Sequence, residues 1–571
     1  MNHLPSNIGQ SIQVQLRPSG DDFDPANHNH NFHSYPAVAG WNYDERESTL
    51  VINKKFTGVP IPFDAFLQSW LFFGLIATVA RTDQPFKATD FTEKGIGNYV
   101  HTKTLNEHLK KWKESELSKK DGLFDRMIRA EAALVKARRV VLKYCSYDTE
   151  KELPWSHPYF IDSEIALSLM VLGETLAAAK EKIVKQADLP HIRGWYGDAN
   201  EGWGTPRCII KRMKDDKWCK RTVQTLRGQL RNHATSFLAA WAAHQQAHIH
   251  FRGHEFCTEN ECNSKSENEG KKYQTKHHDI YCTGSNCRQL GPKIQDLVNI
   301  LDNDNFPLLT LKVSGQGKAV SVDDVKAIDY MPHTTYATFS HIWSDGYGNE
   351  TANELWQCQL RFFYELLQNG KLKQDIPFYI DTLAVPVGEA HKPQRKKAIR
   401  KINEVFHHAA YTIVIDSGLS NMQPGDGYEL LAMKILASGW MRRLWTLEEA
   451  YLSDRLMINF DKIQLLDVDN DVEGGYGKAG DSLSSNVADV AQSYFHNILG
   501  PQRRKRRANL DQHGNFVPTG GVEGVGLLAS VWQASRWRVG EFPGLVAFKF
   551  LTRIHRRPHI QNTKRWLWQP S

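Results

Sequence analysis

Four of the eight cysteines lie within one short segment of the 571-residue chain. They form two pairs with the same internal spacing, Cys257-x4-Cys262 and Cys282-x4-Cys287. Zinc in structural sites prefers four thiolate or imidazole ligands in a tetrahedron, and two short pairs can supply them. The spacing therefore predicts a structural zinc site, in which nearby His254 or His277 can replace one cysteine. The alternative is four unrelated thiols in a loop.

A second group of chemically capable residues follows residue 335, where short apolar runs end in polar side chains. YATFSHIWSDG ends a predicted strand with Ser340 and His341, and Trp343 and Asp345 follow directly. Two further apolar runs, IPFYI and AYTIVI, are followed directly by Asp381 and Asp416. These runs alternate with amphipathic helical segments, which predicts a parallel sheet covered by helices. Ligands bind beyond the carboxyl ends of such strands, so we expect these residues to line a crevice.

The same residues could also have purely structural roles. A histidine at a strand end is commonly a structural residue, and an aspartate there commonly caps the next helix. The basic run PQRKKAIRK at 393–401 is most simply a solvated helix face, with Ile399, Ile402, Val405, Phe406 and Ala409 on the opposite side. The chain contains no phosphate-binding P-loop motif.

The elements that must position these residues follow from hydrophobic periodicity. Residues 1–60 are polar and rich in Asn, His and Pro, including His28, His30 and His33, and are predicted to be a flexible arm. Residues 61–250 space apolar residues at three and four, which predicts a helical domain. The window DAFLQSWLFFGLIATVA is too short to cross a bilayer and predicts a buried helix. We expect the zinc segment at 251–290, the α/β domain at 330–465, and a basic, partly looped region at 466–571.

Charge is distributed unevenly. Residues 501–571 contain thirteen Lys or Arg and three Asp or Glu, although the whole chain carries a formal net charge of +7. The preceding residues are therefore slightly acidic, which argues against a nucleic-acid-binding protein. The N-terminus has no basic segment followed by an apolar run, so we expect no secretory signal. Together with the cysteine usage this predicts a reducing, cytoplasmic compartment, with PQRRKRR at 501–507 as an optional nuclear signal.

Three ordered sequence blocks resemble those of the fungal heterokaryon-incompatibility (HET) domain proteins. The first, YATFSHIWSDGYGN, is similar to a strand that ends in Ser-His-x-Trp. The second, YIDTL at 379–383, departs from the family at Ala384, where Cys is usual, and at Val387, where Gln is usual. The third, RLWTLEE at 443–449, has Glu448 in place of Gln. The resemblance covers about residues 336–460.

The resemblance implies a TIR-like, flavodoxin-like α/β fold, after a mainly α-helical N-terminal region and a small Cys-rich zinc-binding segment. HET proteins are associated with non-self recognition and programmed cell death when incompatible fungal cells fuse. In related TIR enzymes that cleave NAD⁺, a Trp-x-x-x-Glu helix carries the catalytic glutamate. By that comparison Glu449 is the catalytic candidate, and Trp445 precedes it at the same interval.

The chemistry implied is cleavage of the nicotinamide–ribose bond, which passes through an oxocarbenium-like centre that a carboxylate can stabilise. Ser340, His341, Trp343, Asp345, Asp381 and Trp445 would then bind the ligand. The competing hypothesis is a non-catalytic scaffold that only contacts proteins. Expected partners are other incompatibility or signalling proteins, or a second copy of this chain. Membrane association and nucleic-acid binding are not expected.

Overall fold

The computed structural model describes residues 1–5, 8, 12–17, 31–83, 87–93, 98–147, 153–195, 197–244, 256–260, 275–278, 280–282, 284, 286–315, 320–369, 376–420, 427–460, 462–468, 470, 482–483 and 485–495. Cys262, His254, His28, His30 and the PQRRKRR run lie outside these residues. The chain divides into two compact units. The first comprises Met1–Glu255, Asp416–Ser438 and Met457–His496, and the second comprises Phe256–Ile415, Gly439–Leu456 and Asn497–Ser571.

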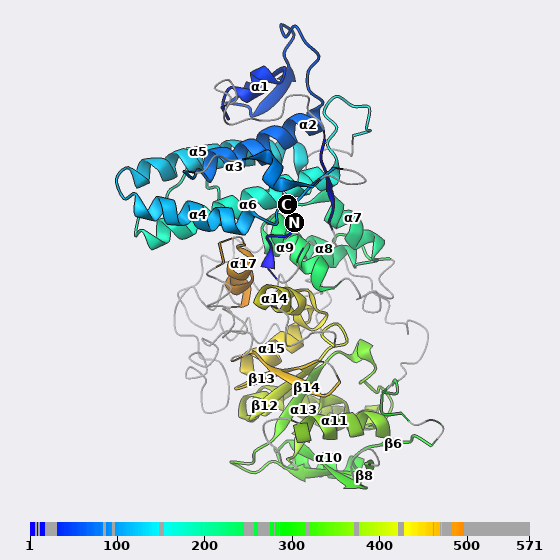
Figure 1. The fold of residues 1–571 in the computed structure, drawn as a ribbon. Coiled ribbons are helices and arrows are strands. Elements are labelled where there is room, and N and C mark those ends of the chain that lie inside the picture. Colours follow the sequence, from blue (N-terminus) through cyan, green and yellow to red (C-terminus); the bar gives the residue numbers. More distant parts are fainter. Residues whose placement is uncertain are drawn as a thin grey trace, which may run out of the picture. The chain divides into compact units, whose positions relative to one another are not determined.

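The first unit is mainly helical, as the periodicity predicts (Figure 1). Its longer helices are α4 (Leu105–Ser118), α5 (Leu123–Cys145), α6 (Ser163–Gln186), α7 (Arg207–Asp215), α8 (Lys220–Leu230) and α9 (Ala234–Ala243). Helices α5 and α6 pack against each other along their buried faces. Asp162 precedes helix α6, and its carboxylate accepts hydrogen bonds from the backbone N–H groups of Glu164 and Ile165 and so caps the helix. Two later helices, α14 (Tyr428–Ala437) and α17 (Val487–Phe495), join this unit and pack against α9.

The apolar window after residue 62 forms a buried helical segment, which confirms the prediction of a buried helix. It consists of α2 (Phe63–Gln68), a π-helical turn at Ser69–Gly74 and α3 (Leu75–Val79). Phe66, Trp70 and Leu75 are fully buried within it. Among the described residues, no helix combines the length and apolar character needed to span a bilayer.

The described part of the N-terminal sixty residues is folded. It contains α1 (Tyr35–Val38) and a hairpin of β2 (Trp41–Asp44) and β3 (Thr49–Ile52). A small antiparallel sheet joins β1 (Val14–Gln15), β5 (Tyr99–Val100) and β4 (Thr92–Glu93). These residues fold because buried side chains such as that of Trp41 remove apolar surface from water.

A seven-stranded sheet organises the α/β part of the chain, in the order β14-β13-β12-β9-β11-β7-β8. Its strands are β7 (Pro307–Ser314), β8 (Ser321–Asp329), β9 (Ala337–His341), β11 (Phe378–Tyr379), β12 (Tyr411–Ile415), β13 (Leu456–Phe460) and β14 (Gln464–Asp467). Strand β9 is parallel to both of its neighbours, β11 and β12. Its five residues are all buried, as expected for a parallel strand covered on both faces.

The sheet is mixed, so the predicted parallel arrangement holds for β9 with β11 and β12 but not for the edges of the sheet. Strands β7 and β8 form an antiparallel hairpin, β7 is antiparallel to β11, and β13 is antiparallel to β14. The hairpin precedes the sequence blocks that signal the sheet. Its alternating runs, LTLKVS and VDDVKAID, carry charged residues and therefore give a weak hydrophobic signal.

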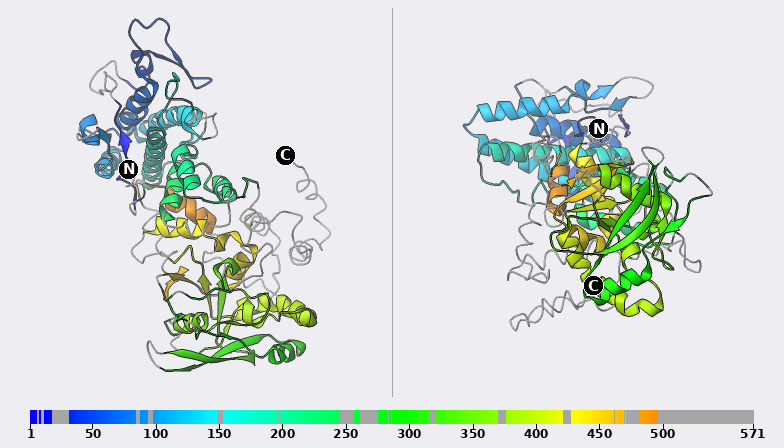
Figure 2. Two further views of the ribbon diagram at one scale, coloured as in Figure 1. Left: turned by 90° about the vertical axis from the view of Figure 1, so that its right-hand side faces the viewer. Right: turned by 90° about the horizontal axis from the view of Figure 1, so that it is seen from below.

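Helices cover this sheet in the second unit (Figure 2). They are α10 (Ile294–Asp302), α11 (Gln357–Asn369), α12 (Asp381–Ala384), α13 (Lys392–His408) and α15 (Leu444–Leu452). Helix α15 contacts β9 and α13, which brings the third sequence block beside the first. Val405, Phe406 and Ala409 of the predicted apolar face join a core cluster with Tyr336 and Tyr379.

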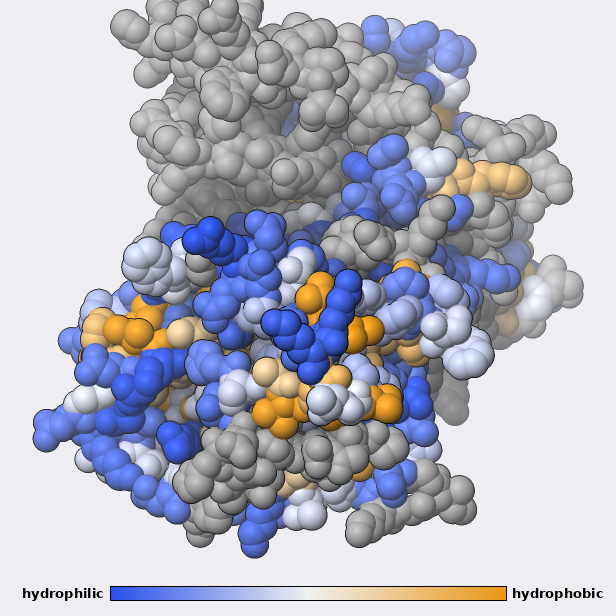
Figure 3. Space-filling model, turned by 90° about the horizontal axis from the view of Figure 1, so that it is seen from above, coloured by the Kyte–Doolittle hydropathy of each residue, from blue (hydrophilic) through white to orange (hydrophobic). Residues whose placement is uncertain are grey.

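Hydrophobic residues also reach the surface. On the face drawn in Figure 3 they lie in separate patches among hydrophilic residues. In the first unit, Phe124, Ile128 and Trp195 are exposed and line a cavity of about 510 Å³. Its charged lining residues are mostly committed to partners within the unit. Lys136, for example, pairs with Glu45 at 3.0 Å.

Candidate ligand cavity and metal centre

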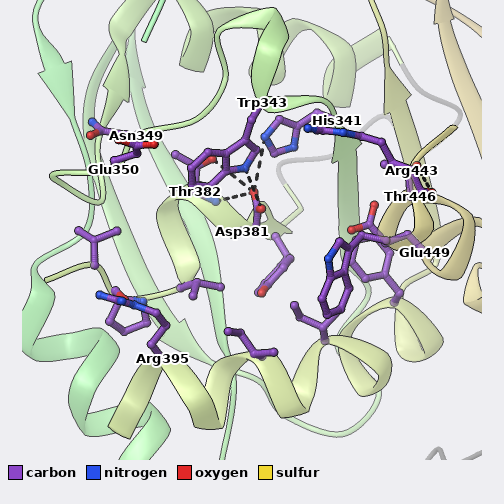
Figure 4. Close-up of a pocket in the computed structure, with 18 residues that line it drawn as sticks. His341, Trp343, Asn349, Glu350, Asp381, Thr382, Arg395, Arg443, Thr446 and Glu449 are labelled. Carbon is purple, nitrogen blue, oxygen red and sulfur yellow. Dashed lines mark hydrogen bonds and ion pairs between the residues drawn. The ribbon is translucent and has the colours of Figure 1, made fainter. Parts of the chain in front are cut away.

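A cavity of about 520 Å³ opens at the carboxyl ends of β9 and β11 in the second unit. All three sequence blocks contribute to its lining: His341 and Trp343 from the first, Asp381 from the second, Trp445 and Glu449 from the third (Figure 4). The volume is within the usual range of small-molecule sites. The sequence predicted a crevice at this place, beyond the ends of parallel strands.

Glu449 is positioned by helix α15. Trp445 and Glu449 are four residues apart, so they share the helix face that looks into the cavity, while Leu447 and Ala450 are buried. The Ser340 hydroxyl donates a hydrogen bond to Glu449 Oε2 at 2.5 Å, and the Trp440 indole N–H donates to Ser340 Oγ at 2.7 Å. Glu449 is thus held through the end of strand β9.

The environment of Glu449 favours its neutral form. Burial is the largest cause and raises the pKa of its carboxyl well above the ordinary value, and the nearby carboxylates Asp381 and Glu448 raise it further. The Ser340 hydrogen bond and the charge of Arg443 oppose this shift. A cation that entered the cavity would lower the pKa and favour the carboxylate, since an opposite charge nearby favours the ionised form.

Asp381 organises the opposite wall of the cavity. Its Oδ2 accepts a hydrogen bond from the Trp343 indole N–H at 3.1 Å, and its Oδ1 accepts one from the Thr382 backbone N–H at 2.6 Å. His341 Nε2 lies 3.5 Å from Asp381 Oδ1. Burial lowers the pKa of His341 despite Asp381, so the imidazole is neutral near pH 7. In Figure 4 the carboxyl groups of Asp381 and Glu449 face a common space.

Two predicted ligand-binding residues are not among the residues that line this cavity. Ser340 is fully buried behind it and contacts Glu449, so its place is that of a positioning residue. Asp345 ends the short 3-10 turn Trp343–Asp345 and is absent from the lining. Asp416 is also absent, and its carboxylate accepts the backbone N–H of Gly418 at 2.5 Å.

The structure adds Tyr379 and Arg395 to the cavity lining, and neither was selected from the sequence. The Tyr379 hydroxyl is buried and has no hydrogen-bond partner among the described residues. Arg395 belongs to the basic run that was predicted to be solvated. Its guanidinium donates to the carbonyl oxygens of Pro386 and Gly388 at 2.9 and 2.7 Å, which fixes a positive charge at the cavity. In Figure 4 Arg395 lies well apart from Asp381 and Glu449.

A separate cluster of possible metal ligands brings together His277, Cys282, Cys287 and Cys358, with all four ligand atoms within 4.8 Å of one another. Such a cluster could bind a metal such as zinc. Cys282 and Cys287 are two of the predicted ligands, and His277 was the predicted substitute. The remaining two predicted cysteines are not in it: Cys257 is a buried thiol that is not one of the four, and Cys262 lies outside the described residues.

Cys358 joins the cluster because of local chain pairing that the spacing of cysteines does not reveal. Strand β6 (Gln289–Leu290) follows Cys287 and pairs with β10 (Leu355–Trp356), which immediately precedes Cys358 at the start of α11. This antiparallel pair brings two thiols distant in sequence beside each other. Burial raises the pKa of the Cys358 thiol to about 12.

Neighbouring residues hold the side chains of the cluster in place. His277 Nδ1 lies 3.2 Å from Cys282 Sγ and 3.7 Å from Cys358 Sγ. The His277 ring stacks on Trp356 with ring centroids 3.9 Å apart, and the His278 backbone N–H donates to Cys358 Sγ at 3.2 Å. Contacts of this kind orient ligands around a metal.

Comparisons with models of known protein families, with curated proteins and with solved structures found no match.

Proposed function

We propose that this chain is a HET-type effector of non-self recognition and programmed cell death, acting in the cytoplasm through the cavity of its α/β unit. One observation carries the proposal: three sequence blocks that lie up to about a hundred residues apart contribute side chains to a single cavity. If these blocks only formed the hydrophobic core, we would not expect a histidine, two tryptophans and two carboxylic acids to surround one cavity.

The reaction proposed is hydrolysis of NAD⁺ at the bond between nicotinamide and ribose. Nicotinamide leaves with the bonding electron pair, and positive charge develops on the ribose ring. The Glu449 carboxylate stabilises that charge, water adds at the same carbon, and a proton is released with ADP-ribose. The cationic nicotinamide ring itself supports ionisation of Glu449, because its charge offsets the burial that keeps the carboxyl neutral.

The other lining residues suit the remaining parts of this ligand. Trp343 and Trp445 offer aromatic surfaces on which a ring can stack. Arg395, held by two backbone carbonyl groups, suits a phosphate at a distance from the carboxyl end of the cavity. The buried hydroxyl of Tyr379 and Nε2 of His341, which have no hydrogen-bond partner among the described residues, are available to a ribose.

The test is nicotinamide release from NAD⁺ by the purified full-length protein at high protein concentration, followed by chromatography. Glu449→Gln keeps the shape of the side chain but removes its charge, and we expect at least a 100-fold loss of rate. Glu389→Gln is the matched control, because Glu389 is an exposed carboxylate in the same unit and does not line the cavity. It should retain the rate of the unmodified protein.

The scaffold hypothesis makes the opposite prediction in cells. If the effector function is only assembly, Glu449→Gln should leave toxicity of the expressed protein unchanged. Absence of nicotinamide release from the unmodified protein, or equal release from Glu449→Gln, would overturn the catalytic proposal.

A further inference from the structure

We propose that His277, Cys282, Cys287 and Cys358 bind one Zn²⁺ ion, and that this ion holds in place the loop at residues 342–349, which forms a wall of the ligand cavity. The inference does not depend on which ligand the cavity takes. It joins two features that are separate in the sequence, namely a set of metal ligands and a cavity loop.

The donor set fits zinc by type and by distance. Zinc bonds of about 2.0–2.3 Å in a tetrahedron place two ligand atoms roughly 3.5–3.8 Å apart. His277 Nδ1 lies 3.2 Å from Cys282 Sγ and 3.7 Å from Cys358 Sγ, so small shifts of these atoms suffice to surround one ion. Four protein ligands complete the tetrahedron, which makes the site structural.

The metal-binding segment is bonded directly to the cavity loop. Residues 275–278 form neither helix nor strand, yet the Lys276 backbone N–H donates to the Gly346 carbonyl oxygen at 3.0 Å. The Thr275 hydroxyl donates to the Gly348 carbonyl oxygen at 2.6 Å. Gln359, next to the ligand Cys358, donates from Nε2 to the Gly346 carbonyl oxygen at 2.9 Å.

The fit between the two segments is close. Gly346 has a φ of +96°, and a Cβ added there would lie 2.5 Å from the Cβ of Lys276. A Cβ added at Gly348 would lie 2.6 Å from the indole ring of Trp343. Glycine is therefore required at both positions. Because the packing is this close, a displacement of residues 275–278 would also displace the loop that carries Trp343.

The loop in turn completes the cavity. It carries Trp343 and Asn349, which line the cavity, and the Trp343 indole contacts Asp381. The carbonyl oxygen of Tyr347 also accepts a hydrogen bond from the Thr382 hydroxyl at 2.7 Å. Zinc bound to His277 and Cys358 would restrain the loop, because residues next to both ligands donate hydrogen bonds to it. Metal binding lowers the freedom of such segments, which lack secondary structure.

The first experiment measures metal in the purified full-length protein by elemental mass spectrometry. We expect one zinc per chain, loss of that zinc in Cys358→Ser, and retention in Cys257→Ser. The two variants are matched, because both replace a buried thiol and only one belongs to the cluster. Full zinc content in Cys358→Ser, or no zinc in the unmodified protein even after it is purified with added Zn²⁺, would overturn the ligand assignment.

Because Cys358→Ser could lose zinc by misfolding, a second variant keeps all four metal ligands. His277→Cys should still bind metal, and in cobalt-exchanged protein its visible absorption should shift toward that of a four-thiolate site. An unchanged cobalt spectrum would exclude His277 as a ligand.

Hydrogen–deuterium exchange measures whether zinc restrains the loop at residues 342–349. Removing zinc with a chelator should speed amide exchange in residues 342–349 at least tenfold and leave β12 (Tyr411–Ile415) unchanged. Equal exchange in the loop with and without zinc would refute the restraint. Nicotinamide release is not used here, so failure of this inference and failure of the proposed reaction are distinguishable.

Discussion

Ser340 Oγ donates a hydrogen bond to Glu449 Oε2 at 2.5 Å, although 109 residues separate the two side chains in sequence. The bond joins the end of strand β9 to helix α15 and fixes the carboxyl group that faces the cavity. Trp440 adds a second hydrogen bond to the same hydroxyl. The Ser-His corner of the first sequence block therefore supports the third block directly.

Ser340→Ala should destabilise the protein by about 1–3 kcal/mol, because two buried partners each lose a hydrogen bond. Urea unfolding followed by tryptophan fluorescence measures this change. Ser118→Ala is the control, since its exposed hydroxyl bonds only to a neighbouring carbonyl group, that of Ser115, and should cost little. Equal effects of the two substitutions would show that the Ser340 contact contributes nothing to stability.

The pH dependence of stability should change in Glu448→Gln. Burial raises the pKa of Glu448 from about 4.5 to about 7, against a lowering effect of Asn403. The unfolded chain therefore loses this proton first, and stability falls as the pH rises from about 4.5 to 7.

Glu448→Gln removes that loss. Relative to the unmodified protein, we expect it to gain up to roughly 3 kcal/mol as the pH rises through this window, since each pKa unit corresponds to about 1.4 kcal/mol. Urea unfolding at several pH values tests this, with the exposed Glu389→Gln as control. A stability difference that does not vary with pH would contradict the assignment to Glu448.

Tyr379→Phe should stabilise the unliganded protein by about 1 kcal/mol and weaken binding of NAD⁺ about tenfold. The substitution removes a buried hydroxyl that has no hydrogen-bond partner among the described residues, and such a group costs free energy when desolvated. Urea unfolding and calorimetric titration measure the two effects.

Tyr336→Phe is the matched control for Tyr379→Phe. The Tyr336 hydroxyl donates to the Val405 carbonyl oxygen at 2.6 Å, so its loss should destabilise the same core. If both variants shift stability in the same direction, the Tyr379 hydroxyl is not an unsatisfied group.

Glu131→Ala should destabilise the helical unit by about 3–5 kcal/mol. Lys180 Nζ lies 2.6 Å from Glu131 Oε2, and both side chains are at most 1% exposed, so the substitution leaves a buried charge unpaired. The double variant Glu131→Met with Lys180→Met should be much less destabilised, because no charge remains. Urea unfolding followed by circular dichroism decides, and a double variant as unstable as Glu131→Ala would argue against charge burial as the cause.

The sequence determined the local features of this protein. Periodicity sufficed for the helical region and for the buried helix after residue 62, because an amphipathic or apolar run needs only its neighbours to form. The positions of Ser340, His341 and Asp381 at strand ends also followed, because each polar residue directly ends a short apolar run. Cys282 and Cys287 were recognisable from their spacing as a pair of possible metal ligands.

Only the tertiary structure decided which distant side chains meet. Cys358 lies 71 residues after Cys287 and reaches it through pairing of β6 with β10, and no spacing rule contains that information. Arg395 belongs to a basic run that reads as solvated, yet hydrogen bonds to two carbonyl groups hold it at the cavity. The antiparallel edges of the sheet were decided in the same way, because strand pairing is a non-local interaction that hydrophobic periodicity does not encode.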